Sequence, residues 1–219
     1  MSVITVQDLR PSFGAIRDQG SRPTCIAFAM SDAHAATRDL FRPFSVEHLY
    51  YHAIQRTLGG HPDDGVNMPT IIEALELDGQ CEELGWPYQQ VLPHDISTWR
   101  PPATARLVLR HDSVLYTYPA MTILKVLDDG WPIVLVFRMS KQFYTPINDK
   151  IVPDPSDTDV GYHAVVVVGH GIESPTHYLM IRNSWGNTWG FGGHAWISMD
   201  YFNPRIIAFA VMTKRRIVK

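Results

Sequence analysis

Cysteine is scarce in this chain of 219 residues, which contains only Cys25 and Cys81. Two cysteines are too few for a disulfide scaffold, and they form no C-x-x-C pair of the kind that binds zinc. A chain of this length buries roughly 70–75% of its unfolded surface, so its core needs no disulfide bonds. The composition therefore predicts a protein of a reducing, cytoplasmic compartment, and no motif suggests a metal or a cofactor.

Long apolar runs and a charge excess are also absent. The longest apolar runs, residues 133–137 and 164–168, are far shorter than the ~18 residues that a membrane span requires. Residues 1–11 lack the apolar region of a signal peptide. Nineteen basic and 22 acidic side chains give a net charge of −3, which leaves no positive excess to neutralise phosphates. We therefore expect neither nucleic acid nor a membrane as the partner.

What is present is a globular balance, with 45% hydrophobic and 19% charged residues. The first half has helical patterns. Residues 25–40 are rich in alanine and contain no glycine or proline, with one apolar stripe through Phe28, Ala29, Ala33 and Ala36. Ser45 is placed to cap a second helix, and Asn67 precedes a third that ends near Gly79. A proline-rich stretch, residues 86–102, then indicates an extended covering loop.

The second half has strand patterns. After a short helix at residues 119–129, apolar and β-branched stretches predict strands at residues 133–137, 162–168, 177–182, 194–199 and 206–211. Helices first and strands second favour an α+β fold with two lobes packed face to face. A cleft between two lobes is a common place for a binding or active site.

One cysteine stands where its chemistry can matter. A loop containing Gly20 and Pro23 delivers Cys25 to the start of the alanine-rich helix. The N–H groups and partial positive charge of a helix start favour the thiolate, which is the reactive form. The side-chain amide of Gln19, six residues earlier, can point into the same space. The alternative is that Cys25 is an ordinary small buried residue, the usual state of a free cysteine.

A base and a residue to orient it occur in the second half. His163 stands at the head of the most β-branched strand, 138 residues after Cys25, so the two must meet through the fold. The Asn183 amide can accept from the imidazole and fix its tautomer, and Trp185 can shield that bond from water. The alternatives are a core histidine and a turn formed by residues 183–186.

Taken in order, Gln19, Cys25, His163 and Asn183 resemble the catalytic set of the papain-like cysteine peptidases. The resemblance extends from about residue 8 to 200, and its motifs are Asp8-Leu9-Arg10, Gln19-Gly20, Cys25-Ile26-Ala27-Phe28, Asp78-Gly79-Gln80-Cys81-Glu82, Trp86-Pro87-Tyr88, His163-Ala164-Val165 with Gly169, and Asn183-Ser184-Trp185-Gly186 with Trp189-Gly190. It implies a single papain-like catalytic domain over residues 1–219. A helical lobe would span about 20–113, and a β-barrel-like lobe would consist of about 114–213 together with the N-terminal segment, with the active site in the cleft between them.

The resemblance also implies an activity and a role for each residue. A peptide or protein substrate would be hydrolysed by the Cys25 thiolate and the His163 imidazolium through an acyl-enzyme, with Gln19 in the oxyanion hole and Asn183 orienting His163. A mostly apolar substrate site would be formed by Gly65, Val66, Asn67, Met68, Val136, Gly161, Tyr162 and Trp185. Two alternatives stay open: another papain-fold acyl reaction (transferase, amidase or isopeptidase) and a non-catalytic peptide-binding module.

The chain departs from the family pattern in three places. Arg22-Pro23-Thr24 replaces the usual Cys-Gly-Ser, so the cysteine of a family disulfide is missing, and Ile26 replaces the usual tryptophan. The chain begins about where mature family members begin, so we expect no inhibitory propeptide. Restraint would then come from a regulatory partner, an adjacent domain or the acidic loop 146–159 acting as a lid; a solvated connection is the alternative for that loop.

Overall fold

Three helices form the N-terminal lobe: α1 (Cys25–Thr37), α2 (Val46–Arg56) and α3 (Met68–Leu77). The structure is a computed structural model, and it describes residues 2–38, 42–106, 108–111, 114–116 and 121–212. As expected, Ser45 and Asn67 cap α2 and α3, where each side chain accepts a backbone N–H bond of 3.0 Å. The sequence predicts the first helix over residues 25–40, whereas α1 ends at Thr37. Residues 39 and 40 lie outside the described residues.

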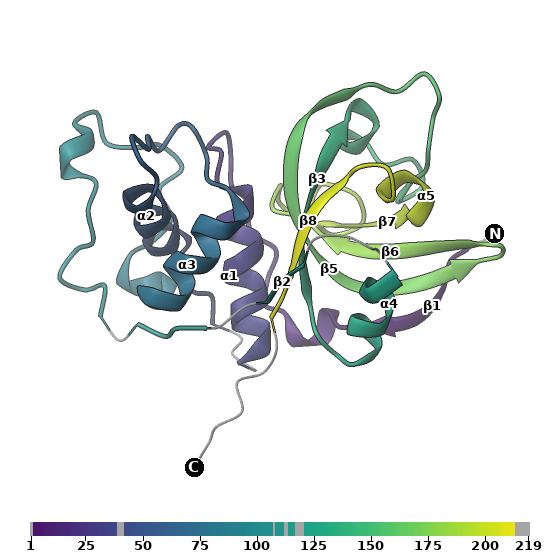
Figure 1. The fold of residues 1–219 in the computed structure, drawn as a ribbon, viewed down its shortest axis with the longest axis horizontal. Coiled ribbons are helices and arrows are strands. Elements are labelled where there is room, and N and C mark those ends of the chain that lie inside the picture. Colours follow the sequence, from purple (N-terminus) through teal and green to yellow (C-terminus); the bar gives the residue numbers. More distant parts are fainter. Residues whose placement is uncertain (1, 39–41, 107, 112–113, 117–120, 213–219) are drawn as a thin grey trace, which may run out of the picture.

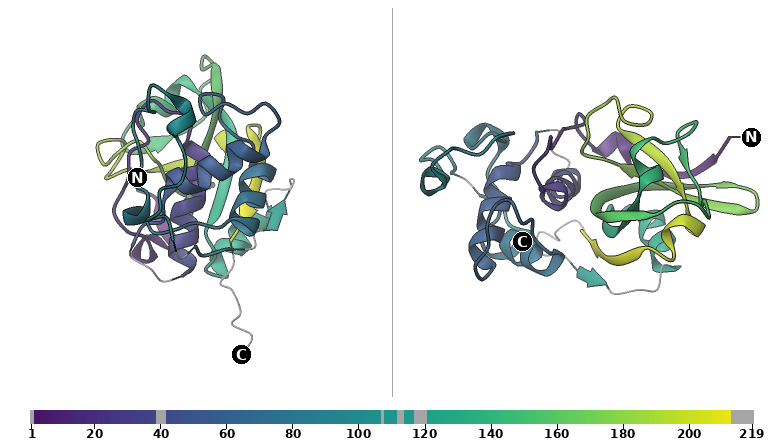
Figure 2. Two further views of the ribbon diagram at one scale, coloured as in Figure 1. Left: turned by 90° about the vertical axis from the view of Figure 1, so that its left-hand side faces the viewer. Right: turned by 90° about the horizontal axis from the view of Figure 1, so that it is seen from above.

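Helix α1 is the centre of the molecule. Figures 1 and 2 show it between the other two helices and the sheet lobe. The four residues of the expected apolar stripe are buried, and so is every other residue from Ile26 to Thr37. Helix and sheet pack against opposite sides of α1, which leaves it no solvent face. Its alanines allow this close approach, and its buried Asp32 bonds to two arginine side chains.

The second lobe is an eight-stranded sheet in the order β2-β8-β3-β5-β6-β7-β4, with β1 paired to β5. All pairs are antiparallel except β4 with β7. The strands are β1 (Ile4–Asp8), β2 (Val114–Tyr116), β3 (Ile133–Ser140), β4 (Lys150–Ile151), β5 (Asp159–Glu173), β6 (Thr176–Arg182), β7 (His194–Ser198) and β8 (Ile206–Val211), with helices α4 (Met121–Asp128) and α5 (Met199–Phe202) beside them. Five strands fall where the sequence predicts them, whereas β1, β2 and β4 are additions.

Strand β5 joins the two cores. Ala164, Val166 and Val168 pack with the helices, while Val165 and Val167 point to the interior of the sheet lobe. Both faces of this strand are therefore buried, which explains its continuous apolar sequence. Because α1 packs against β5, the first residues of the helix lie next to the residues around position 163.

The loop of residues 86–102 contains no helix or strand apart from the 3-10 turn Ile96–Thr98. Two buried tryptophans, Trp86 and Trp99, attach it to the helical lobe. The sequence is therefore right about an extended segment, and the aromatic side chains, rather than regular backbone pairing, hold it in place.

Candidate active site

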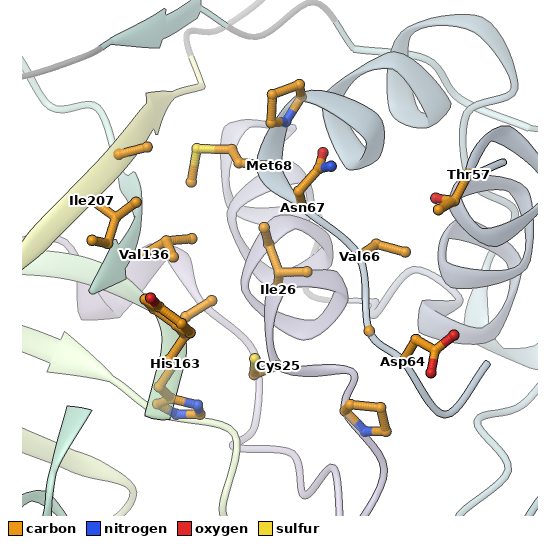
Figure 3. A pocket seen from close by; sticks show the side chains of 16 residues that line it. Cys25, Ile26, Thr57, Asp64, Val66, Asn67, Met68, Val136, His163 and Ile207 are labelled. Atoms are coloured by element: carbon orange, nitrogen blue, oxygen red, sulfur yellow. The ribbon is translucent and has the colours of Figure 1, made fainter. Parts of the chain in front are cut away.

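A pocket of about 530 Å³ lies between the lobes. Cys25 and His163 both line it, together with apolar side chains from α1, α3, β3, β5 and β8 (Figure 3). Its lining residues are Pro23, Cys25, Ile26, Thr57, Asp64, Gly65, Val66, Asn67, Met68, Pro69, Val136, Tyr162, His163, Ala164, Ile207 and Ala208. The fold thus brings together, across the contact of α1 with β5, two residues that are 138 positions apart in the chain.

Cys25 is the first residue of α1 and is half-buried, so its sulfur lies at the positive end of the helix. Burial raises the pKa of the Cys25 thiol, and hydrogen bonds from the backbone of Ala164, Ile26 and Cys25 itself act in the opposite direction. The contact with Ala164 places the sulfur beside the residue that follows His163. Cys25 and Cys81 are both free thiols.

His163 is 4% exposed, and its Nε2 lies 2.8 Å from Oδ1 of Asn183. The asparagine oxygen can only accept, so Nε2 carries the proton and Nδ1 is left to accept a proton from a neighbour. Burial lowers the pKa of His163 to about 4, and the bond to Asn183 acts to raise it. Asn183 Oδ1 also accepts the Ser184 backbone N–H at 2.9 Å, which fixes the amide orientation.

Gln19 is buried and its amide is held at both ends. Its Nε2 donates to the carbonyl oxygen of Arg22 at 2.9 Å, and its Oε1 accepts from the Ser184 hydroxyl at 2.7 Å. A backbone bond from Gln19 N–H to Ser184 oxygen, 2.8 Å, ties the two segments together. The side-chain amide nitrogen keeps one N–H that the Arg22 carbonyl does not use.

An aromatic wall covers the histidine on the sheet-lobe side. The Trp185 ring centroid lies 4.7 Å from that of His163, as the sequence predicts for a residue that shields the bond to Asn183. Phe143 lies 5.4 Å from the imidazole, and Tyr144 stacks on Trp185 at 5.5 Å. Sequence reasoning missed Phe143 and Tyr144, because they come from a short 3-10 turn that only the fold brings to His163.

Six of the eight predicted substrate-site residues line the pocket: Gly65, Val66, Asn67, Met68, Val136 and Tyr162. Gly161 and Trp185 do not, and for these two a role in substrate binding stays a prediction. The Trp185 ring packs instead against the His163 imidazole. Sequence reasoning also missed Ala164, Ile207 and Ala208, since β8 reaches the site only through its pairing with β3.

The lid prediction for residues 146–159 is also wrong. None of these residues lines the pocket. The loop contains β4, which pairs with β7, and it lies on the sheet lobe away from the helices (Figure 1). Strand pairing at the far edge of the sheet therefore decided its position, although it directly precedes β5 in the chain.

Among the described residues, no three histidine, cysteine, aspartate or glutamate side chains gather closely enough to hold a metal ion. No helix in the same part of the chain has the length and apolar character needed to cross a bilayer.

This fold and geometry define a class of two-lobed proteins in which a cysteine at a helix start faces a strand histidine held by an asparagine. Residues 6–213 match the family described as papain family cysteine protease, so the chain belongs to the papain family of cysteine proteases.

Individual relatives agree with this assignment. An uncharacterized peptidase C1-like protein of Acanthamoeba polyphaga mimivirus is 26% identical over 81% of this chain and 62% of its own length. A cysteine protease of Blomia tropicalis is 25% identical over 85% of this chain and 58% of its own length. Among solved structures, xylellain, a cysteine protease from Xylella fastidiosa, superposes with a TM-score of 0.77 at 26% identity, covering 98% of this chain and 88% of that chain. The chain therefore spans about three-fifths of the length of these two sequence relatives.

Proposed function

We propose that this chain is a cysteine peptidase that hydrolyses peptide bonds through Cys25 and His163. The observation that carries the proposal is that the helix-start thiol and the asparagine-held imidazole line one pocket between the lobes. The family relationship supports the same chemistry.

In the proposed reaction, the Cys25 thiolate attacks the substrate carbonyl carbon and forms a tetrahedral oxyanion. The His163 imidazolium gives its Nδ1 proton to the leaving amine as the C–N bond breaks, leaving a thioester. The neutral imidazole then takes a proton from water, whose oxygen attacks the thioester. Collapse of the second tetrahedral species releases the carboxylic acid product and restores the thiolate and the imidazolium.

The two pKa directions bear on the resting state. Burial raises the pKa of Cys25 and lowers that of His163, so each charge alone is unfavourable in this pocket. Transfer of the thiol proton to Nδ1 creates both charges together, and each then stabilises the other. Opposite charges ~4 Å apart attract by about 4 kcal/mol at an effective dielectric of 20, equivalent to about three pKa units. Because of this attraction, we propose that the ion pair is the reactive form.

The oxyanion would be stabilised by two N–H donors. One is the backbone N–H of Cys25 at the start of α1, and the other is the unused N–H of the Gln19 side chain. The Ser184 hydroxyl holds the amide oxygen of Gln19 and so keeps its nitrogen turned to the site. Loss of one such donor typically costs ~10²–10³ in kcat.

The pocket supports a preference for an apolar side chain next to the scissile residue, at P2. Met68, Val136 and Ala208 line it, and Ile207 and Val66 extend its apolar surface (Figure 3). Each buried CH₂ contributes about 0.8 kcal/mol, so leucine at P2 exceeds alanine by up to roughly 2.4 kcal/mol in transition-state binding. Asp64, at the helical-lobe side of the pocket, further disfavours an acidic P2 residue.

The test is cleavage of a peptide library by the wild type, Cys25→Ala, and Cys81→Ala as the matched control. We expect the wild type and Cys81→Ala to cleave, and Cys25→Ala to be inactive. Turnover of isopeptide or simple amide substrates without peptide cleavage would assign the chain to another acyl reaction. Peptide binding without turnover of any acyl substrate would show a binding module. We also propose a reducing, cytoplasmic location, which the free state of both thiols supports.

A further inference from the structure

Arg22 is a buried arginine three residues before the candidate nucleophile. Its exposed fraction is 5%, and it occupies the position where the family resemblance leads one to expect a disulfide cysteine. Arginine is almost never buried unless it is paired. The groups around Arg22 therefore decide what an arginine does at this position in place of a cysteine.

The partner is Glu47 of α2, whose side chain is fully buried. Nη1 of Arg22 donates to Oε1 and Oε2 of this carboxylate at 3.1 and 2.8 Å, and also to the carbonyl oxygen of Gln89. Glu47 accepts two further hydrogen bonds. The Gln89 backbone N–H donates to Oε2, and the Trp99 indole N–H donates to Oε1. Three donor groups therefore bond to this carboxylate, which is what a buried negative charge requires.

Aromatic rings enclose the guanidinium on its other sides. Its central carbon lies 5.1–5.9 Å from the ring centroids of Tyr50, Tyr88 and Trp99, within cation–π range. The Tyr88 hydroxyl donates to the carbonyl oxygen of Gln19 at 2.8 Å and lies 2.8 Å from the Thr24 hydroxyl. The three rings of Tyr50, Tyr88 and Trp99 form a cage around the guanidinium. Through the Tyr88 hydroxyl, this cage holds both ends of residues 19–24.

The backbone of Arg22 connects this cage to the catalytic site. Its carbonyl oxygen accepts the Gln19 side-chain N–H at 2.9 Å and the Thr24 backbone N–H at 2.8 Å. One bond orients the candidate oxyanion donor, and the other fixes the residue that precedes Cys25. A shift of Arg22 that displaced this carbonyl would turn the Gln19 amide with it.

We propose that the Arg22–Glu47 pair is a positioning device for the oxyanion hole, fixing the Gln19 amide through the Arg22 carbonyl in place of a disulfide. This inference rests on the proposed function and adds Arg22, Glu47 and Tyr88 to it as positioning residues. The device is ionic, so it holds the segment under reducing conditions that would open a disulfide.

The test is a double-mutant cycle of Glu47→Gln with Gln19→Ala, read as kcat/KM for one peptide substrate. Glutamine is isosteric with glutamate, but its NH₂ group faces two N–H donors at Glu47. We expect Glu47→Gln to lower kcat/KM about tenfold, mainly in kcat, as a partial loss of one oxyanion donor. In the Gln19→Ala background the same change costs less than about twofold, because the donor it positions is gone.

Two controls separate positioning from general damage. Glu73→Gln removes the same charge from an ion pair with Arg56 in which Glu73, on α3, is 55% exposed, and its kcat/KM stays within about twofold of wild type. Alkylation of Cys25 by iodoacetamide forms no oxyanion, so its rate also stays within about twofold in Glu47→Gln. If Glu47→Gln does not fold, Tyr88→Phe replaces it in the cycle, with an expected loss of about fivefold in kcat/KM because the hydroxyl that bonds to Gln19 and Thr24 is gone.

Equal losses from Glu47→Gln in both backgrounds overturn the inference, as does unchanged kcat/KM in the folded single variant. A matching fall in the Cys25 alkylation rate also overturns it, since the pair would then act on the nucleophile. A wild-type chain that cleaves no peptide overturns the proposed function, and the inference with it. If the wild type cleaves peptides but the kcat/KM losses of Glu47→Gln and Gln19→Ala multiply in the double variant, the inference is overturned and the proposed function stands.

Discussion

The substitution Asp32→Asn tests how the two lobes are held together. Asp32 lies on α1, seven residues after Cys25, and its carboxylate binds Arg17 Nη2 at 2.6 Å and Arg182 Nε at 2.7 Å. Arg182 ends β6 immediately before Asn183, so this carboxylate links the helix of the nucleophile to the strand that leads to the orienting amide.

The size of the expected stability loss follows from the two arginine side chains that would be left without this carboxylate charge. Arg182 is buried at 4% exposure and Arg17 is partly buried at 15%, so both cations remain largely out of water when the charge between them is removed. Removing one partner from a buried ion pair costs about 3–5 kcal/mol. At 2–4 °C per kcal/mol for a chain of this size, the melting temperature should fall by roughly 6–20 °C at pH 7.

The pH dependence has a definite sign. Burial acts to raise the pKa of Asp32, but the attraction of Arg17 and Arg182 prevails and holds this pKa below its ordinary value. A carboxyl with a depressed pKa in the folded state stabilises the fold above its unfolded pKa, about 3.9, and loses that stabilisation as the pH falls through the folded value. Protonated Asp32 resembles asparagine, so the stability difference between the two proteins begins to narrow below about pH 4 and closes once the pH has fallen past the folded pKa.

The assay is thermal unfolding of wild type and Asp32→Asn at pH 7, 5 and 3. Asp159→Asn is the matched control, because Asp159 also binds two arginines, Arg205 at 3.1 Å and Arg138 at 3.4 Å, but is 34% exposed. Exposed pairs contribute about 0–1 kcal/mol, so this control should shift little. Similar shifts for the two variants at pH 7, or a gap for Asp32→Asn that does not narrow at pH 3, would refute the reasoning.

The remaining predictions concern the site. Iodoacetamide near pH 6 should modify Cys25 much faster than Cys81, whose pKa burial raises and which is fully buried; equal rates would contradict the proposed activation. In His163→Ala the alkylation profile of Cys25 should move to a pH above the ordinary thiol pKa of about 8.5, since burial then acts unopposed, and coincident profiles would show that no ion pair forms. Asn183→Ala should lower kcat far less than His163→Ala, and equal loss in folded proteins would remove the orienting role. Peptides with leucine at P2 should exceed those with aspartate at least tenfold in kcat/KM, whereas Met68→Lys, which places a positive charge in the pocket, should reduce that ratio.

Local signals in the sequence determined a large part of this protein. The capping side chains of Ser45 and Asn67 set helix starts by bonds to residues three positions away, which any short window of sequence reveals. The run around Val166 identifies a strand buried on both faces. The candidate residues Cys25 and His163 could be found from the sequence because each lies in a short contiguous motif that resembles the family's.

Tertiary structure alone decided the features that depend on distant pairing. The strand pairing of β4 with β7 carried residues 146–159 away from the pocket, although sequence proximity to His163 suggested a lid. Packing on opposite sides buried residues 26–37 of α1, including Asp32, whose partner Arg182 is 150 residues away.

The same reason explains the cage around Arg22. Its acceptor, Glu47, comes from α2, and its rings come from α2 and from the loop of residues 86–102, so no local pattern marks the arginine as buried. The sequence determined which groups could do chemistry, because residue type and local backbone fix a side chain's reactivity. The fold decided which of those groups meet, because burial and long-range hydrogen bonds arise only when separate elements pack.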